Sequence, residues 1–498
     1  MNLIPPNQSM MSMIKSPFVS CSVAGIFFVS LARAADQPPA PSGPQTDGPF
    51  HKVILDADQR LNGKWTDTLK DPMELAVATD GRVFYAQRDG IIKMWKPETK
   101  TTMIIARIPV FEGLEEGMLG ITLDPDFARN GWLYLNHSLP ETTRDARGKA
   151  GIIRVSRYTL AGDSLDPASE KRILDTAVQR EECCHVGGSL AFDSQGNLYV
   201  SVGDNTNPFA SDGYSPTDER PGRSPWDAQK SAANPNDLRG KVNRVHPEPD
   251  GSVTIPKGNL FPPGTPGTRP EIYVMGCRNP FRISLDRKTG YLYWGEVGPD
   301  AGGTSPNRGP AGFDEVNQAR QAGFFGWPYF IADNKAYVKY DFARSLSGAP
   351  FNPFRPVNQS PNNTGAKDLP PAQPAFIYYT YGPSTRFPLV NGGGGRTAMA
   401  GPVYYFDPAL ISEAKLPQEY DHTLFIYEWS RNWIIAVHLD ADERIAKMER
   451  FCEHMTFKRP MDMELGPDGC LYLIEFGSAW GNNVDSQLVR IEHHRPQS

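Results

Sequence analysis

The chain has 498 residues, of which 39% are hydrophobic and 11% aromatic, and this composition argues against a disordered protein. Gly and Pro number 46 each, so loops must be abundant between the structured parts. The formal net charge of -6 gives no reason to expect nucleic acid or an anionic membrane as a partner.

The N-terminus has the pattern of an export signal. Lys15 supplies a positive charge, residues 17–31 an apolar core and residues 32–34 a small-x-small cleavage site. Because the core is short and rich in small residues, it predicts a cleaved signal over residues 1–34 and an exported protein, periplasmic or extracellular. An uncleaved anchor is the alternative. Residues 35–48 are Pro-rich and predict a disordered leader, and no later stretch is long and apolar enough to cross a bilayer.

A weak repeat recurs along the rest of the chain and predicts strand hairpins. Each copy has an apolar strand with period-2 alternation, a polar turn with Asp and Gly, and an aromatic-rich second strand. The copies lie at residues 73–90, 117–138, 187–204, 281–298, 401–407 with 423–440, and 461–477. Six hairpins at irregular spacing predict an all-β fold, a six-bladed β-propeller with long loop insertions. A large β-sandwich or two stacked β-domains is the alternative.

Long insertions separate some of the repeats. Residues 205–237 and 342–374 are rich in Pro, Asn, Ser and Gly, and loops of this length without regular structure are commonly functional. We expect both insertions to cover one face of the propeller. The glycine run 392–395, followed by Arg396, predicts another rim loop, and residues 314–322 predict one short helix.

Polar residues stand immediately before three of the repeat strands, where the blades of a propeller converge on its channel. His185 precedes the third copy, and a histidine at such an entrance acts as a general base near neutral pH. Arg278 and Asn279 hold the equivalent place before the fourth copy, where an Arg steadies negative charge that develops on an oxygen. Glu115 and Glu116 precede the second copy, and we expect one of them in the channel. A structural role is the alternative for each.

Two acidic loops have the composition that a hard cation prefers. Residues 298–300 (Gly-Pro-Asp) and 313–315 (Phe-Asp-Glu) offer carbonyls and carboxylates of the kind that calcium binds, and Asp333 adds a further carboxylate. No EF-hand pattern is present. Loops that are merely solvated are the alternative.

Five cysteines remain once the signal is removed: Cys183, Cys184, Cys277, Cys452 and Cys470. An exported protein can hold disulfides, but five is odd, so at least one thiol stays free or pairs elsewhere. No CxxC or Cys/His spacing indicates zinc. Two bridges are hypotheses: one of the adjacent pair with Cys277, which would tie two channel entrances together, and Cys452 with Cys470.

Seven stretches of the sequence occur in an order that is quite specific for one protein family, although no single stretch is specific by itself. They are EEGMLGITLDPDF, HVGGSLAFDSQGNLYVSVGD, LRGKVNRVHPEPDGSV, PEIYVMGCRNPF, WGEVGPD, DEVNQARQAGFFGWP and LGPDGCLYLIEFG. Together they resemble the soluble glucose/sorbosone dehydrogenases, the pyrroloquinoline-quinone-dependent aldose dehydrogenases. The resemblance implies a single propeller domain over residues 49–494 that oxidises a sugar or related alcohol with calcium-bound quinone. It also implies an electron acceptor, which the sequence does not identify.

The resemblance implies roles for individual residues. His185 matches the catalytic base, which takes the proton of the anomeric hydroxyl while hydride passes to the quinone. Arg278 and Asn279 match the pair that faces the quinone edge of the cofactor. The backbone carbonyls of Gly298 and Pro299 match the ligands of the calcium ion that the cofactor binds.

A second, structural calcium site is also implied by the resemblance. Glu315 and the carbonyl of Phe325 match part of this site. Asp333 is a further candidate ligand because its carboxylate lies nearby in the sequence.

The chain departs from the family pattern in three places that concern binding. Glu115 stands where the family has a Gln on the substrate side. A Lys that contacts the cofactor falls near Ser430 and Arg431, and an R-x-R pair becomes Arg459 and Met461. Losing a cation costs the cofactor a charge-assisted hydrogen bond of about 1.5–3 kcal/mol. A non-catalytic propeller that binds carbohydrate or protein, and a calcium-dependent hydrolase on the same scaffold, are therefore the alternatives.

Overall fold

The computed structural model describes residues 45–61, 63–140, 150–390 and 394–494. The expected signal over residues 1–34 lies outside the described residues, as does most of the expected leader over residues 35–48. The end of that leader is ordered, because β1 (Thr46–Asp47) pairs antiparallel with β2 (Phe50–Ala57). Within the described residues, none of the helices has the length and apolar character needed to cross a membrane.

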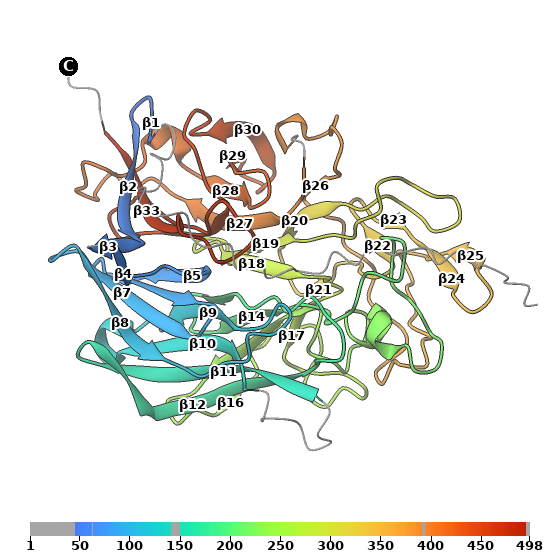
Figure 1. The fold of residues 1–498 in the computed structure, drawn as a ribbon. Helices are drawn as coiled ribbons and strands as arrows, with labels where there is room; N and C mark the ends of the chain where they lie inside the picture. Colours follow the sequence, from blue (N-terminus) through green and yellow to red (C-terminus); the bar gives the residue numbers. More distant parts are fainter. Residues whose placement is uncertain (1–44, 62, 141–149, 391–393, 495–498) are drawn as a thin grey trace, which may run out of the picture. The chain divides into compact units, whose positions relative to one another are not determined.

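Six antiparallel sheets confirm the expected six-bladed β-propeller (Figure 1). Blade 1 consists of β5 (Pro72–Val77), β6 (Val83–Gln87), β7 (Ile91–Lys96) and β8 (Thr101–Arg107), and blade 2 of β9 (Met118–Leu123), β10 (Trp132–Ser138), β11 (Ala150–Ala161) and β12 (Ser164–Gln179). Blade 3 consists of β13 (Leu190–Phe192), β14 (Leu198–Val202), β15 (Lys241–Pro247) and β17 (Ile272–Met275), and blade 4 of β18 (Pro280–Leu285), β19 (Leu292–Glu296), β20 (Asp314–Ala319) and β26 (Ile377–Tyr379). Blade 5 consists of β27 (Ala398–Tyr404), β28 (Thr423–Glu428), β29 (Trp433–Leu439) and β30 (Ile445–Phe451), and blade 6 of β31 (Pro460–Leu465), β32 (Leu471–Glu475), β33 (Gln487–His493) and β2.

The ring closes between the two ends of the described chain. β2 pairs antiparallel with β33, so that Phe50 lies opposite His493, and Figure 1 shows β2 in blue beside β33 in red. The first strands of neighbouring blades contact one another all the way round, from β5 to β9, β13, β18, β27, β31 and back to β5. Each predicted hairpin therefore supplies the inner strands of one blade.

Antiparallel order places two kinds of loop at the same end of every blade. The loop that enters the first strand and the loop between the second and third strands both lie at this end, because strand direction alternates. We call this end of the propeller the site face. The predicted catalytic and cofactor residues belong to these loops: Glu115, His185, Arg278, Asn279 and Arg459 precede first strands, and Gly298, Pro299 and Arg431 follow second strands.

Smaller elements occupy the connections between the strands of the blades. They are β3 (Gln59–Leu61), β4 (Lys64–Asp67), α1 (Phe127–Asn130), η1 (Ser224–Trp226), η2 (Ala228–Lys230), β16 (Val253–Thr254), β21 (Gly323–Phe324), β22 (Phe330–Ile331), β23 (Lys335–Ala336), β24 (Val338–Asp341), β25 (Leu346–Pro350), η3 (Pro388–Val390) and η4 (Gln418–Tyr420). The two insertions expected to crown one face contact each other. Nδ2 of Asn358 donates to the carbonyl of Gln229 at 2.8 Å, and Oγ of Ser360 to Asp227 at 2.6 Å.

The prediction of a short helix over residues 314–322 is wrong, because Asp314–Ala319 form strand β20. This strand pairs with β19 on one side and with β26 on the other. Five of its six residues are buried. Hydrogen bonding along both edges within a sheet outweighs a weak local helical preference.

A buried arginine crosses the centre of the ring. Arg282 of β18 is fully buried and donates to the carbonyls of Met73 in blade 1, at 2.6 Å, and Met461 in blade 6, at 3.1 Å. Its Nε lies 3.6 Å from Oδ1 of Asp462. Burial raises the pKa of Asp462 to about 6, although Arg282 acts to lower it. A single side chain from blade 4 thus binds two other blades.

A buried carboxylate extends the same network to blades 2 and 3. Oε2 of Glu74 accepts the backbone N–H of Ile121 at 2.8 Å and that of Leu190 at 3.3 Å. Burial raises the pKa of Glu74 well above its usual value, while Arg282 acts to lower it. We call Glu74, Arg282 and Asp462 the central cluster, and it connects five of the six blades.

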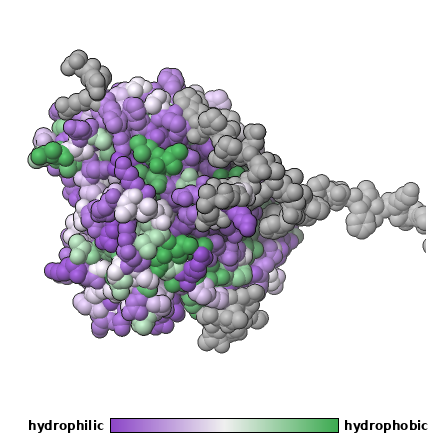
Figure 2. Space-filling view, turned by 60° about the vertical axis from the view of Figure 1, so that its left-hand side comes forward, coloured by the Kyte–Doolittle hydropathy of each residue, from purple (hydrophilic) through white to green (hydrophobic). Residues whose placement is uncertain are grey.

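The described residues on one face of the molecule form no broad apolar surface in the part that Figure 2 leaves uncovered. Figure 2 shows hydrophilic residues over most of this face and hydrophobic residues in small separate groups. Large apolar side chains that are at least three-quarters exposed are Phe209, Phe354, Ile411 and Trp480. Scattered exposed apolar residues of this kind are normal for a folded domain.

A buried histidine in blade 2 makes stability depend on pH. His137 of β10 is 2% exposed, and its Nε2 lies 3.2 Å from Oγ of Ser156. Burial lowers the pKa of His137 to about 4, so the unfolded chain binds this proton more readily than the folded chain between pH 4 and the ordinary histidine value of about 6.5. The contribution of neutral His137 to stability is therefore lost as the pH falls through this window.

We expect His137→Gln to flatten that acid decline. Between pH 7 and pH 5, the wild-type free energy of unfolding should fall by about 2 kcal/mol more than that of the variant. Urea unfolding at the two pH values measures the difference. Parallel declines in the two proteins would show that His137 does not cause the loss.

Candidate active site

His185 and Asp204 form a buried hydrogen-bonded pair where blade 3 begins. Nδ1 of His185 lies 2.8 Å from Oδ1 of Asp204, and the two residues are 4% and 0% exposed. Asp204 also accepts the backbone N–H of Thr206 at 3.0 Å and Nε1–H of Trp327 at 2.7 Å. A carboxylate held by these donors orients the imidazole ring, leaves Nε2 for a ligand and stabilises the protonated ring.

Asp204 is absent from the residues predicted from the sequence. It is the last residue of the third repeat, at residues 187–204, and lies two residues after β14. The loop after a second strand lies at the same end of the blade as the loop before a first strand. The alternation of strand direction therefore predicts that the Asp204 carboxylate lies at the same end of the blade as His185.

The backbone of His185 is fixed on both sides. Its N–H donates to Oε2 of Glu115 at 2.7 Å, and its carbonyl accepts the N–H of Asn205 at 3.0 Å. A Cβ on Gly203 would lie 2.3 Å from the carbonyl carbon of His185, so this close approach requires glycine. The structure thus brings Glu115, expected on the substrate side, next to the candidate base.

The neighbouring acid has a different environment. Glu116 is buried and accepts two charge-assisted hydrogen bonds from Arg180, at 2.9 Å from Nε and 2.8 Å from Nη2. Arg180 lies five residues before His185 in the chain. This ion pair therefore anchors the segment that leads to His185, and only the first acid of the Glu115-Glu116 pair reaches the histidine.

Both disulfide hypotheses are wrong. Cys183 and Cys184 are bonded to each other, directly before His185. Cys277, Cys452 and Cys470 are buried and have no disulfide partner in the described chain. Burial raises the pKa of the Cys277 thiol, which packs as a small apolar group in the core rather than reaching the adjacent pair.

Hydrogen bonds, and not a disulfide, join the two channel entrances. Oδ1 of Asn279 accepts the N–H of Gly187 at 3.0 Å, and the carbonyl of Arg278 accepts the N–H of Asp204 at 2.8 Å. Oε1 of Glu296 accepts the backbone N–H groups of Arg278 and Asn279. Burial raises the pKa of Glu296 to about 7, and the N–H donors act to lower it. The predicted base and the predicted Arg-Asn pair therefore form one connected site.

Arg278 is buried beside the loop that follows β19. Its Nη1 donates to the carbonyl of Val297 at 2.8 Å, and its Nη2 lies 3.7 Å from Oδ2 of Asp300. Its Nε–H has no hydrogen-bond partner among the described atoms. A buried N–H without a partner is costly, which makes this group a candidate for binding a ligand.

The carbonyl expected to bind calcium already has a cationic partner. Nη2 of Arg396 donates to the carbonyl oxygen of Pro299 at 2.7 Å, and the N–H of Gly298 donates to Asp314 at 3.1 Å. A Cβ on Gly312 would lie 1.6 Å from the same Pro299 oxygen, so the protein encloses this oxygen on that side. A divalent cation here would lie against the guanidinium of Arg396 and be repelled by it.

The Pro299 carbonyl, which accepts a hydrogen bond from Arg396, does not fit a calcium ion. Clusters of three or more His, Cys, Asp or Glu side chains able to hold a metal are absent from the part of the chain that the structure describes. Asp314 is a buried carboxylate beside the loop, but it accepts the N–H groups of Gly298 and Ala398 and lies 3.5 Å from Nη1 of Arg396. We therefore assign no step of the chemistry to calcium.

The second calcium site, expected at Glu315, Phe325 and Asp333, stays a prediction. Glu315 accepts N–H groups from Ala332 and Asn317. Asp333 is 2.6 Å from Lys335, in an ion pair at the surface. Both carboxylates thus have protein partners in the described structure.

The side chain of Arg431, expected to bind the cofactor, donates among the described residues only to the backbone of the connection between blades 4 and 5. It donates to the carbonyls of Gly395 at 2.9 Å, Val390 at 2.7 Å and Thr380 at 3.0 Å. An arginine with three backbone acceptors braces the segment around it. We infer that Arg431 positions Gly395, directly before Arg396, and does not itself face a ligand.

Arg459, the other expected cofactor residue, lies against two tryptophans. Its guanidinium carbon is 4.3 Å from the ring centroid of Trp429 and 5.2 Å from that of Trp480. Its backbone N–H donates to Asn432 at 2.7 Å. The side chain of Met461, which stands where the family has a second Arg, is buried.

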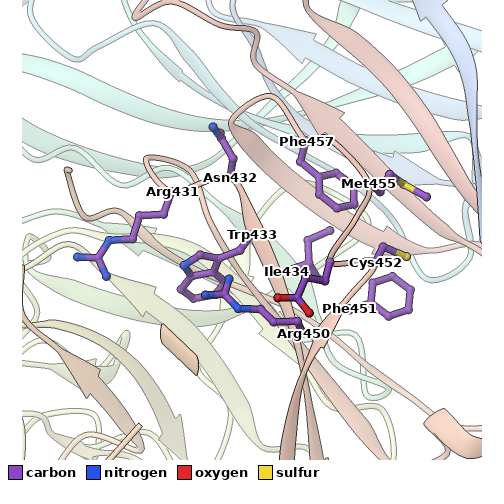
Figure 3. Close-up of a pocket in the computed structure, with 10 residues that line it drawn as sticks. Arg431, Asn432, Trp433, Ile434, Arg450, Phe451, Cys452, Met455 and Phe457 are labelled. Carbon is purple, nitrogen blue, oxygen red and sulfur yellow. The ribbon is translucent and has the colours of Figure 1, made fainter. Parts of the chain in front are cut away.

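A cavity of about 240 Å³ lies beside this region and not at His185 (Figure 3). It is lined by the loop after β28, by β29 and β30, and by the loop after β30, including Asn432, Arg450, Glu453 and Phe457. Figure 3 shows Arg431 directed away from Phe451, Cys452 and Met455. Geometry and hydrogen bonding, rather than cavity size, identify the His185 site.

Comparisons with known proteins match most of the chain. The Glucose / Sorbosone dehydrogenase family model matches residues 69–351. Quinoprotein glucose dehydrogenase B of Acinetobacter calcoaceticus is 24% identical over 479 residues, 91% of each chain. The Hedgehog-interacting protein of Homo sapiens is 25% identical over 242 residues, 44% of this chain and 31% of that protein. The PQQ-bound form of an aldose sugar dehydrogenase from Streptomyces coelicolor shares the fold, with a TM-score of 0.54 and 17% identity over 91% of this chain and 99% of that one. The chain belongs to the glucose/sorbosone dehydrogenase family.

Proposed function

We propose that this protein is a sugar dehydrogenase that oxidises an aldose or a related alcohol with pyrroloquinoline quinone as cofactor. Membership of the family and the quinoprotein relative support this activity. The observation that supports it most directly is the connected group of His185, Asp204 and Arg278 on the site face. A buried histidine with a carboxylate behind it, next to a buried arginine, suits removal of a proton beside an electron acceptor.

The residues present fit a quinone that carries three carboxylates. Arg278 and Arg396 are buried at one loop, and the Nε–H of each lacks a hydrogen-bond partner among the described residues. Arginine matches carboxylate geometry, and a buried N–H gains most from a charged acceptor. We propose that these two side chains hold the cofactor, with Asn279 next to Arg278 in the chain.

Each protein group has a defined part in the oxidation. When bound, the quinone supplies the acceptor for the hydride that leaves the alcohol carbon with its electron pair. Nε2 of His185 takes the proton of the alcohol hydroxyl, and the carbon–oxygen bond becomes a carbonyl. Asp204 stabilises the imidazolium that results, and Arg278 steadies negative charge on the acceptor side. Glu115, half-buried beside His185, is our candidate for orienting the substrate.

Asp204→Asn should weaken turnover without weakening the binding of the quinone. We expect turnover to fall about 10- to 100-fold, the usual cost of removing a carboxylate that orients a working histidine. Steady-state kinetics gives the turnover, and calorimetry gives the affinity. Asp212→Asn is the matched control, because Asp212 has the same charge but a largely exposed side chain. Equal turnover in the Asp204 and Asp212 variants would remove Asp204 from the mechanism.

Reconstitution tests the proposed function as a whole. The purified protein is titrated calorimetrically with pyrroloquinoline quinone and then assayed for dye reduction with a panel of aldoses. We expect binding at micromolar cofactor and reduction of the dye by at least one aldose. Absence of binding at that concentration would reject the quinone-dependent activity.

A non-catalytic binding propeller is the second candidate. The match to the human Hedgehog-interacting protein and the absence of the second Arg at Met461 favour it. It predicts no turnover in the reconstitution experiment whatever the acceptor. Export, expected from residues 1–34, stays a prediction under either function.

A further inference from the structure

Two arginines from neighbouring blades flank the loop that follows β19, and we propose that they form a carboxylate-binding site in which Arg396 supplies the positive charge expected from calcium. The site presupposes the proposed function, and it narrows the ligand to a planar acid held through its carboxylates without a metal ion. Arg278 precedes blade 4 and Arg396 precedes blade 5. Both contact the 297–300 segment.

The guanidinium of Arg396 is buried and incompletely paired. Its side chain is 1% exposed, and Nη2 donates to the carbonyl of Pro299 at 2.7 Å. Nη1 lies 3.5 Å from Oδ1 of Asp314, beyond hydrogen-bond geometry, and Nε has no acceptor within the described residues. A buried cation with two N–H groups that lack an acceptor lowers the stability of the fold unless a ligand accepts hydrogen bonds from these groups. A carboxylate is the acceptor that an arginine of this kind binds best.

The second arginine faces the same segment with an N–H that also lacks an acceptor. Nη1 of Arg278 donates to the carbonyl of Val297, and its Nε has no partner among the described groups. Asp300 contacts residues beside both arginines. Its Oδ2 is 3.7 Å from Nη2 of Arg278, and its Oδ1 accepts the hydroxyl of Tyr381, the ring next to Arg396, at 3.1 Å. Asp300 is half-exposed and only loosely paired. A ligand carboxylate with better geometry displaces it from Arg278.

Arg396 is held in place by its chain neighbours. On one side, the carbonyl of Gly395 accepts Nε–H of Arg431 at 2.9 Å. On the other side, the N–H of Thr397 donates to Oε1 of Glu428, and the hydroxyls of Thr397 and Ser430 are 2.9 Å apart. These contacts fix the backbone on both sides of Arg396. A preorganised side chain pays little entropy when it binds a ligand.

An aromatic ring fixes the plane of the guanidinium. The guanidinium carbon of Arg396 lies 3.9 Å from the ring centroid of Tyr381. Stacking of this kind is specific to the planar group of arginine and favours planar ligands beside it. Arg396, which follows a simple rim loop in the sequence, thus forms part of the proposed binding site.

Calcium independence follows from the same contacts. The Pro299 carbonyl cannot accept a hydrogen bond from Arg396 and bind a divalent cation without placing two positive charges together. We expect the wild-type protein to bind pyrroloquinoline quinone with the same affinity in EDTA and in excess calcium. Calorimetric titration of the full chain measures both affinities.

Three variants make the test specific. Arg396→Gln should lose about 10- to 100-fold in affinity in EDTA, the value of a charge-assisted hydrogen bond, and should regain part of it in calcium because Pro299 is then free. Arg396→Lys, which keeps the charge but not the fork, should lose less. Arg386→Gln is the matched control, because Arg386 is exposed and lies in the segment before the glycine run, and its affinity should equal that of the wild type.

A redox-inactive ligand separates this proposal from the proposed function. Benzene-1,3,5-tricarboxylate is titrated in EDTA against the wild type and the Arg396→Gln variant, and thermal unfolding confirms that both are folded. Binding of this acid that depends on Arg396, without binding of the quinone, would support the carboxylate site and reject the quinone. A wild type that binds the quinone only with calcium, or an Arg396→Gln variant that binds both ligands like the wild type, would overturn the proposal. If Arg396→Gln is unfolded, the Arg396→Lys variant is used instead. An affinity of this variant below one per cent of the wild-type value for both ligands would count against the proposal. A smaller loss of affinity would support it.

Discussion

Replacing His185 by alanine is expected to lower turnover about 10²- to 10⁴-fold while the affinity for the quinone stays that of the wild type. In the proposed mechanism, Nε2 of His185 takes the hydroxyl proton, and Asp204, 2.8 Å from Nδ1, stabilises the charge that results. The proposed cofactor contacts come from Arg278 and Arg396, on other loops. The variant therefore removes a step of the chemistry and leaves binding intact. Single-turnover kinetics and calorimetry on the same sample separate the two effects.

The control for this variant lies in the same blade. His246→Ala removes a half-buried histidine of β15 whose Nδ1 is 3.1 Å from Oδ1 of Asn197. It should lower turnover less than twofold. Comparable losses in the two variants would indicate a structural cause, and unchanged turnover in His185→Ala would exclude His185 as the base.

Arg282→Met is expected to have the largest effect on stability, a loss of about 3–5 kcal/mol in the free energy of unfolding. The substitution leaves the carboxylates of Glu74 and Asp462 buried without their shared cation, and the carbonyls of Met73 and Met461 lose their donors. A charge that is buried and unpaired costs far more than an exposed pair contributes. Urea unfolding followed by circular dichroism measures the difference.

Two further variants test the cause of this loss. Arg287→Met changes an exposed arginine two residues beyond β18 and should alter stability by less than about 0.5 kcal/mol. Adding Asp462→Asn to Arg282→Met should recover part of the loss, because one unpaired charge is then removed. A double variant that is less stable than Arg282→Met alone would argue against unpaired charge as the cause.

Local pattern predicted the fold well because each blade begins with a hairpin. Alternation of apolar residues and turn residues is confined to about twenty residues, and β5 with β6 or β18 with β19 match it directly. Pairing between strands far apart in the sequence could not be predicted from local pattern. β20 is a strand only because β19 and β26 flank it, and β2 joins blade 6 across almost the whole chain. Such pairings leave no local signature in a sequence.

The site was partly predictable for the same reason. His185, Arg278 and Asn279 stand directly before repeat strands, and the propeller brings such positions together. The sequence did not point to Arg396, because the role proposed for it depends on its contact with Pro299, which lies far from it in the sequence. The pairing of adjacent cysteines was equally hidden, since a count of thiols does not say which sulfurs meet.

The most direct test of the account follows hydride loss within the loaded site, without any external acceptor. Protein loaded with pyrroloquinoline quinone is mixed anaerobically with an active aldose, carrying either hydrogen or deuterium at the oxidised carbon. We predict that the absorbance of the oxidised cofactor disappears in a single turnover, more slowly with deuterium, and that His185→Ala suppresses the change. A loaded wild-type protein whose cofactor absorbance stays unchanged at saturating aldose would contradict the account.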